Sequence, residues 1–125
     1  MPVINAEPTR RPGAIDPAAL PDAVTRYLDA HRAHDTASAV AAFTGDASVV
    51  DEGRTYEGAD AIEKWLSRSA SEYTYTIRLT GAQQTDGTHF IATQHLEGDF
   101  PGGVVDLHYR FTLRDGLIEQ LVIEP

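Results

Sequence analysis

The sequence predicts an α+β fold in which helices come first and a strongly bent antiparallel sheet wraps around them as a cone. Two observations predict this order. Apolar residues recur at helical spacing in three segments before residue 70, and from Glu72 onward they alternate with polar residues, as in strands that bury one face. The length of 125 residues suits a single domain, and 42% hydrophobic with 23% charged residues is typical of a globular chain.

Charge and composition exclude several function classes. The chain carries 19 Asp and Glu against 10 Lys and Arg, a formal charge of -9, so phosphate-rich partners such as nucleic acids would be repelled. It has no cysteine, which removes thiol catalysis, disulfides and thiolate metal sites. No apolar run is long enough for a membrane span, and no leader-like segment opens the chain. We therefore expect a cytoplasmic protein with neither nucleic acid nor membrane as partner.

The first part of the chain predicts a proline-rich arm followed by two helices. Residues 1–16 show no period and form the expected arm, which leaves 17–125 as the folded domain. Asp16 and Pro17 are typical of a helix start, although Pro21 would delay the regular helix, which then runs to about residue 34. Its buried stripe comprises Val24, Tyr27, Leu28 and His31.

A second helix is predicted over 36–43, with Asp35 as its N-cap and Gly45 ending it in a left-handed conformation. The stretch ASVVDEGRTYEG then predicts two short strands around a turn, and a third helix follows over 59–69. The inner face of that helix carries Ile62, Trp65, Leu66 and Ser69.

The remaining chain predicts four antiparallel strands. Asp86-Gly87 and Asp115-Gly116 are two-residue hairpin signals, and residues 98–103 make a looser connection. Counting outward from a two-residue turn at Asp86-Gly87 places Ile77 opposite Leu96. Alternation then points one set of side chains into the cone: Tyr73, Tyr75, Phe90, Gln94, Leu107, Tyr109 and Phe111. The last strand is apolar on both faces, so we expect Leu117, Leu121 and Ile123 to be exposed on an outer sheet face that forms a homodimer.

Three stretches of this chain carry a family resemblance. RYLDAHRAHDTASAVAAFTGDASVVD, the following YEGADAIEKWL and the late HYRFTLRDGLIEQL resemble the SnoaL-like and ketosteroid isomerase-like branch of the nuclear transport factor two-like superfamily. The resemblance covers residues from about 17 to 124. It implies a cystatin-like α+β roll, with a pocket inside the cone.

The resemblance also implies site residues. Asp51 falls on the catalytic base of ketosteroid isomerases, Tyr27 on the phenol that hydrogen-bonds the substrate oxyanion, and Trp65 on an aromatic pocket wall. Leu107 stands where those enzymes use a second, protonated aspartic acid, so the oxyanion site is half built. Spacing alone adds His31, one helical turn after Tyr27, as a candidate proton shuttle or hydrogen-bonding residue, with a structural histidine as the alternative.

The inward aromatic residues favour a flat, apolar ligand, although filling of the core is the simpler explanation for them. We therefore expect a cofactor-independent isomerase or cyclase of a carbonyl compound of steroid or polyketide type, with Asp51, Tyr27 and His31 as catalytic residues. Leu107 in place of the second acid favours a cyclase or a dehydratase over a strict steroid isomerase. The predicted ligand-binding residues are Trp65, Tyr73, Tyr75, Phe90, Gln94, Leu107, Tyr109 and Phe111. A non-catalytic ligand-binding protein and a protein-interaction module are the alternatives. The five histidines lack metal-ligand spacing, so no metal or cofactor is predicted.

Overall fold

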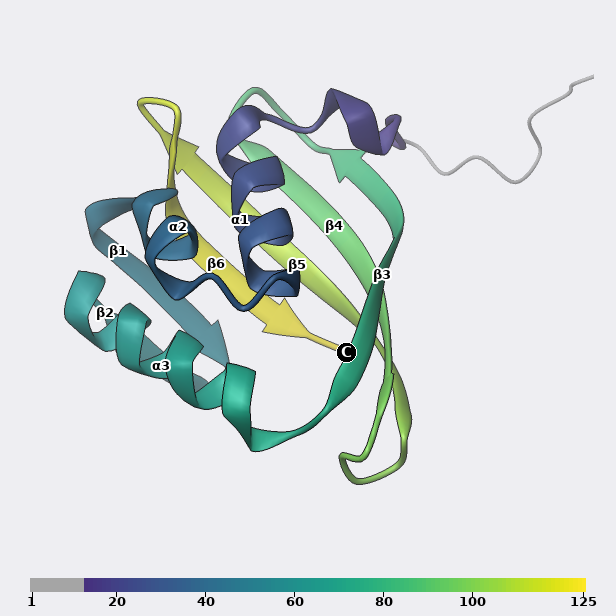
Figure 1. Ribbon diagram of the computed structural model, residues 1–125. Coiled ribbons are helices and arrows are strands. Elements are labelled where there is room, and N and C mark those ends of the chain that lie inside the picture. Colours follow the sequence, from purple (N-terminus) through teal and green to yellow (C-terminus); the bar gives the residue numbers. More distant parts are fainter. Residues whose placement is uncertain (1–12) are drawn as a thin grey trace, which may run out of the picture.

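The fold consists of three helices packed on one side of a six-stranded curved sheet (Figure 1). The computed structural model describes residues 13–125, so most of the predicted arm lies outside the described residues. Residues 13–16 join the sheet through a bridge between Ala14 and Gln83. The predicted α+β roll is confirmed, and the strand order is β2-β1-β6-β5-β4-β3.

The first helical segment is divided by proline, as the sequence indicated. A 3-10 turn spans Pro17–Ala19 with Asp16 as its N-cap, and α1 follows over Asp22–Arg32 after Pro21. Val24, Tyr27 and Leu28 of α1 are buried and His31 is half-buried, so the predicted stripe faces the sheet.

The second and third helices differ from the prediction mainly at their ends. Asp35 caps α2, Thr36–Ala41, through the backbone N–H of Ser38 as predicted. The predicted left-handed end at Gly45 is wrong, because the chain leaves the helix at Ala42 and Gly45 lies inside strand β1, Phe43–Asp51. Helix α3 continues beyond the predicted end and spans Ala59–Glu72.

The sheet joins β1 and β2 to the four later strands, and β1, with nine residues, is longer than the short strand predicted there. β1 pairs antiparallel with β2, Arg54–Glu57, and parallel with β6, Leu117–Glu124. The other long strands are β3, Tyr75–Gln84, β4, His89–Gly98, and β5, Val104–Arg114, and all of their pairings are antiparallel. The parallel pair places the ends of β1 and β6 side by side, which brings Asp51 next to Ile123.

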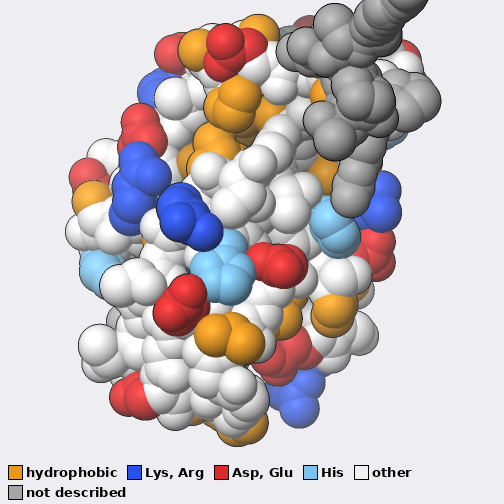
Figure 2. Space-filling view, turned by 90° about the vertical axis from the view of Figure 1, so that its right-hand side faces the viewer, with side chains coloured by type: hydrophobic (Ala, Val, Ile, Leu, Met, Phe, Trp, Pro, Cys, Tyr) orange, Lys and Arg blue, Asp and Glu red, His pale blue; other side chains and the backbone are white. Residues whose placement is uncertain are grey.

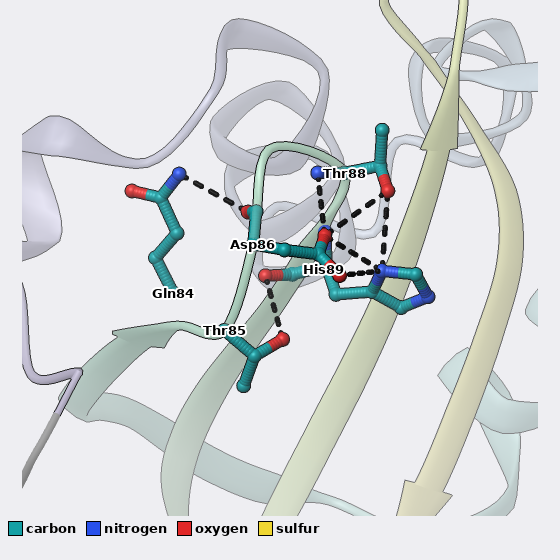
Figure 3. Close-up of polar contacts among 5 residues, drawn as sticks. All are labelled: Gln84, Thr85, Asp86, Thr88 and His89. Atoms are coloured by element: carbon teal, nitrogen blue, oxygen red, sulfur yellow. Dashed lines mark hydrogen bonds and ion pairs between the residues drawn. The ribbon is translucent and has the colours of Figure 1, made fainter.

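The β3–β4 hairpin has the predicted strand pairing near the cleft, but its turn and its strand geometry differ from the prediction. Ile77 lies opposite Leu96 as predicted, but the loop holds three residues, because Thr85 pairs with His89. A bulge between Leu79 and Gly81 absorbs the extra residue. Figure 3 shows why the loop is longer: the Asp86 carboxylate accepts hydrogen bonds from the backbone N–H groups of Thr88 and His89 and contacts the His89 ring.

The prediction for the last strand is wrong in part. Leu121 and Ile123 are buried, with exposed fractions of 0% and 8%, and Leu117 is half-buried. Register shifts in the pairing of β6 with both neighbours break the simple alternation, so that Ile118 and Leu121 both face the core. The homodimer stays a prediction, and two of the three apolar side chains from which it was inferred, Leu121 and Ile123, are buried and cannot contribute to an outer face.

The surface on the side of β3 carries charges of both signs. Figure 2 shows acidic, basic and histidine side chains intermingled there, with hydrophobic side chains only in small separate groups among the described residues. No helix in residues 13–125 is long and apolar enough to cross a membrane.

Candidate active site

A cleft of about 700 Å³ opens at the end of the sheet where β1 and β6 finish and β3 begins. In Figure 1 the label C marks the end of the chain that follows β6, at this end of the sheet. The last turn of α1, the end of α3 and the loop between β4 and β5 complete its walls. Seven of the predicted site residues line it: His31, Asp51, Trp65, Tyr73, Tyr75, Leu107 and Tyr109.

The other four predicted site residues are not among those that line the cleft. Tyr27, Phe90, Gln94 and Phe111 are all buried, with exposed fractions of 6% or less. Tyr27 packs edge-on against Phe111, with 5.8 Å between ring centroids. These four residues belong to the buried interior and not to the cleft wall.

Tyr73 lines the cleft, but it does not belong to the strand in which alternation placed it. It is the C-cap of α3 and is 37% exposed, because the alternating segment becomes a strand only at Tyr75. The cleft also includes Glu72 and Phe100, which were not predicted as site residues, and Ser69, which was predicted only as an inner-face residue of its helix. Glu72 and Phe100 lie just outside the regular strands, where alternation gives no signal.

Asp51 is a half-buried carboxylate with a defined partner. It is the last residue of β1, and the two turn residues that follow, Glu52 and Gly53, have positive φ angles of 52° and 75°. The indole Nε1 of Trp65 donates a hydrogen bond of 3.0 Å to its Oδ2. Burial raises the pKa of Asp51, and the bond from Trp65 opposes that effect. The result is a carboxylate that is oriented and more basic than an exposed one.

Tyr27 lies directly behind the cleft. Its hydroxyl is buried and has no hydrogen-bond partner among the described residues. Burial raises the pKa of Tyr27 well above its usual value, and Tyr109, Asp51 and Tyr75 add to the effect. The Tyr27 phenol is therefore within electrostatic reach of the residues that line the cleft, without being one of them.

His31 and Tyr75 meet at the wall of the cleft. The Tyr75 Oη atom lies 3.4 Å from His31 Nε2, and the His31 ring stacks on Tyr27 with an interplanar angle of 6°. Burial, with a smaller contribution from His34, lowers the pKa of His31 to about 4. His31 is therefore neutral at pH 7. A second hollow of about 280 Å³ lies against the same pair and is also lined by Arg32, His34 and Thr76.

The charged side chains that line the cleft are all acidic. Asp51, Glu52, Glu72 and Glu124 line it, and no described Lys or Arg does. Arg110 lies beside the cleft and pairs with Glu124 at 2.6 Å, so part of this charge is compensated. A ligand carboxylate or phosphate would meet carboxylates in this cleft without a lining cation. The geometry thus favours a neutral ligand that is largely apolar.

The described residues do not suggest a metal centre. No three His, Cys, Asp or Glu side chains within 13–125 are arranged to hold a metal ion. The side chains that line the cleft and can take part in acid–base chemistry are carboxylates, phenols and a neutral imidazole.

Comparisons with known proteins identify the family and the fold of the chain. Residues 24–121 match the sequence profile of the SnoaL-like domain. The crystal structure of a proposed polyketide cyclase from Sinorhizobium meliloti is similar, with 34% identity over 88% of this chain and 100% of that chain, and a TM-score of 0.81. No curated protein matches the chain in sequence.

Two more distant structures share the fold. A protein from Catenulispora acidiphila with a ketosteroid isomerase-like fold, solved in complex with trimethylamine, is 20% identical over 86% of this chain and 87% of that chain, with a TM-score of 0.75. A Mycobacterium tuberculosis protein solved with estradiol-17beta-hemisuccinate is 15% identical over 82% of this chain and 90% of that chain, with a TM-score of 0.69.

Proposed function

The chain belongs to the SnoaL-like domain family, and on that premise we propose that it is an isomerase or cyclase of a small, neutral carbonyl compound, with Asp51 as the base. The observation that carries the proposal is the Asp51 carboxylate itself. It lines a cleft of about 700 Å³, it is half-buried, and the Trp65 indole orients it. The similarity to a proposed polyketide cyclase supports the reaction class.

The proposed reaction begins with removal of a proton from the carbon next to the carbonyl group. The C–H bond breaks, the proton goes to Asp51, and the electron pair moves onto the carbonyl oxygen as an enolate. In an isomerase Asp51 returns the proton to another carbon. In a cyclase the enolate carbon forms the new ring bond to a second carbonyl carbon of the ligand, whose oxygen then takes up a proton. Neither route requires an external oxidant or cofactor.

The walls of the cleft indicate the ligand class. Trp65, Tyr73, Tyr75 and Tyr109 present aromatic surface, and Leu107 adds an aliphatic contact. Such walls suit a flat ring system, and the carboxylates among them disfavour an acid. The estradiol part of the ligand in the M. tuberculosis complex is a ring system of that kind, whereas its hemisuccinate group is an acid.

Hydrogen–deuterium exchange tests the role of Asp51 without the natural substrate. 2-Tetralone is a flat, neutral ketone with exchangeable C–H bonds next to its carbonyl, and proton NMR in deuterated buffer follows their loss. We expect the protein to accelerate exchange and Asp51→Asn to remove about a hundredfold or more of that acceleration. Glu52→Gln is the matched control, because Glu52 also lines the cleft but is exposed. Equal rates for Asp51→Asn and the unchanged protein would refute the proposal.

One observation favours a second candidate, a ligand-binding protein without catalysis. Leu107 lines the cleft where the ketosteroid isomerase resemblance places a second acid, so one donor to the developing oxyanion is missing. This candidate predicts that 2-tetralone binds, as seen in NMR line widths, while its exchange rate stays at that of buffer.

A further inference from the structure

The pair formed by His31 and Tyr75 is a polar feature of the cleft that the proposed reaction leaves without a role. The two side chains come from the last turn of α1 and the first residue of β3, 44 positions apart in sequence. Both line the cleft, and the distance between Tyr75 Oη and His31 Nε2 is 3.4 Å. Two orientations of this hydrogen bond are available, since either atom can be the donor.

The second nitrogen of His31 distinguishes the two orientations. Nδ1 is buried and has no hydrogen-bond partner among the described residues. A neutral imidazole carries one N–H and one lone pair, and a buried N–H without an acceptor is rarer in proteins than an acceptor without a donor. The proton is therefore assigned to Nε2, which is also the more stable tautomer of a free histidine side chain. His31 then donates to Tyr75 Oη.

This orientation fixes what the Tyr75 hydroxyl can do. Its oxygen accepts the bond from His31, so its own proton remains available for an acceptor in the cleft. A phenol that accepts one hydrogen bond becomes a stronger donor in another. Burial and the nearby Asp51 carboxylate both raise the pKa of Tyr75, so the hydroxyl keeps its proton at neutral pH.

Gly98 fixes the position of the Tyr75 backbone. It is the β4 partner of Tyr75, and a Cβ atom at position 98 would lie 2.5 Å from Tyr75 Cβ, closer than side chains approach. The missing side chain lets the first residue of β3 sit tightly against the end of β4. Tyr75 is thus held from two sides, by this strand contact and by His31.

We infer that Tyr75 is the hydrogen-bond donor to the carbonyl oxygen of the ligand, and that His31 is the positioning residue that directs the Tyr75 hydroxyl proton into the cleft. The inference rests on the proposed function and deepens it, because it pairs the base, Asp51, with a donor on the opposite wall. It gives to Tyr75 the role that the resemblance implies for Tyr27, whose side chain lies behind the cleft.

The tautomer of His31 is open to direct measurement. Long-range nitrogen–proton NMR correlations of the imidazole ring, recorded at pH 7 on the full chain, separate the two neutral tautomers and the charged form. We expect a neutral ring with its proton on Nε2. A proton on Nδ1, or a charged ring, would overturn the inference.

A carbonyl-bearing fluorophore tests the role of Tyr75. Prodan is a flat, neutral naphthyl ketone, and the stretching frequency of its carbonyl falls when that oxygen accepts a hydrogen bond. For Tyr75→Phe we expect a higher carbonyl frequency in the infrared spectrum of the bound probe and about a three- to tenfold rise in Kd. Tyr56→Phe is the matched control, since Tyr56 is not among the residues that line the cleft and its hydroxyl accepts a hydrogen bond from Arg68.

Variants of His31 separate positioning from packing. His31→Gln keeps an N–H that can donate to Tyr75, and we expect it to retain the lower carbonyl frequency, whereas His31→Leu loses it. Thermal melting of each variant shows that it is folded. An unchanged frequency in Tyr75→Phe, with prodan still bound, would overturn this inference and leave the role of Asp51 intact. Failure of the unchanged protein to bind prodan would instead count against the proposed ligand class and so against both proposals.

Discussion

Asp51→Asn is expected to make the folded protein more stable while it removes the activity. Burial raises the pKa of Asp51, so the folded state disfavours the charged carboxylate relative to the unfolded chain. Asparagine has no charge, and its side-chain oxygen can still accept the hydrogen bond from Trp65 Nε1, which is 3.0 Å long in the unchanged protein. The substitution thus removes the cost of a partly buried charge and keeps its main contact.

The expected gain is modest because the site is open to solvent. One unit of pKa difference between the folded and unfolded states corresponds to about 1.4 kcal/mol, and water screens a carboxylate that is only half-buried. Arg68 also favours the charged form of Asp51. We therefore expect Asp51→Asn to raise the free energy of unfolding by about 1 kcal/mol or less at pH 7, which moves a urea midpoint by about 1 M at most.

The sign of the pH dependence follows from the raised pKa. Above the folded-state pKa both states carry the charge and the full cost is present, and as pH falls through that pKa the folded state takes up the proton first. The advantage of Asp51→Asn should therefore shrink between pH 7 and pH 4, when urea unfolding is followed by circular dichroism. Asp46→Asn is a control of opposite sign, because hydrogen bonds from Arg114 and Thr44 lower the pKa of Asp46. A lower midpoint for Asp51→Asn at pH 7, or a difference that does not change with pH, would refute the reasoning.

Three further predictions concern the hairpin, the strand contact behind Tyr75 and the charge of the ligand. Asp86→Ala should lower the melting temperature at pH 7, because it removes the acceptor for the Thr88 and His89 backbone N–H groups. The pKa of Asp86 is lowered to about 2, so the stability that its carboxylate contributes is present above pH 4 and is lost as pH falls through about 2. Equal melting temperatures at pH 7 for the variant and the unchanged protein would contradict this prediction. Gly98→Ala should displace Tyr75 and weaken prodan binding severalfold in a fluorescence titration, and an unchanged Kd would show that the strand contact does not position the phenol. The carboxylic acid 6-acetyl-2-naphthoic acid should bind at least tenfold more weakly than 2-acetylnaphthalene at low salt, because the cleft is lined by carboxylates. The difference between the two Kd values should become smaller as salt is added. Tighter binding of the acid would instead indicate a cationic side chain close enough to pair with the ligand carboxylate.

Local signals in the sequence predicted most of the fold. The proline at position 21 delays the helix, Asp35 caps the next one, and Asp115-Gly116 forms the two-residue turn expected of it. Each of these depends on chemistry within a few residues. The helix end at Gly45 failed because the pairing of β1 with β6, more than 70 positions away, takes the chain into the sheet before a glycine is needed.

Irregular strands limited the rest of the prediction. Counting by twos through β3 and β4 gave the correct partners near the cleft only because the longer loop at Asp86 and the bulge at Thr80 cancel. In β6 no such cancellation occurs, so Leu121 was assigned to the wrong face. A bulge depends on how neighbouring strands pack, and a single sequence carries little record of it.

Residue type and position along a helix do not identify which tyrosine can donate a hydrogen bond to a ligand in the cleft. Tyr27 and Tyr75 are both inward tyrosines, and the sequence places both toward the cone. In the structure the Tyr27 side chain is fully buried, with its ring edge-on to Phe43 and Phe111, whereas Tyr75 begins a strand at the open end of the sheet and lines the cleft. Access to the cleft thus depends on depth within the cone, which periodicity does not encode. His31 follows Tyr27 by one helical turn and lies between the buried interior and the cleft wall. Its ring therefore stacks on the buried Tyr27 ring, while its Nε2 atom contacts the Tyr75 hydroxyl at the cleft.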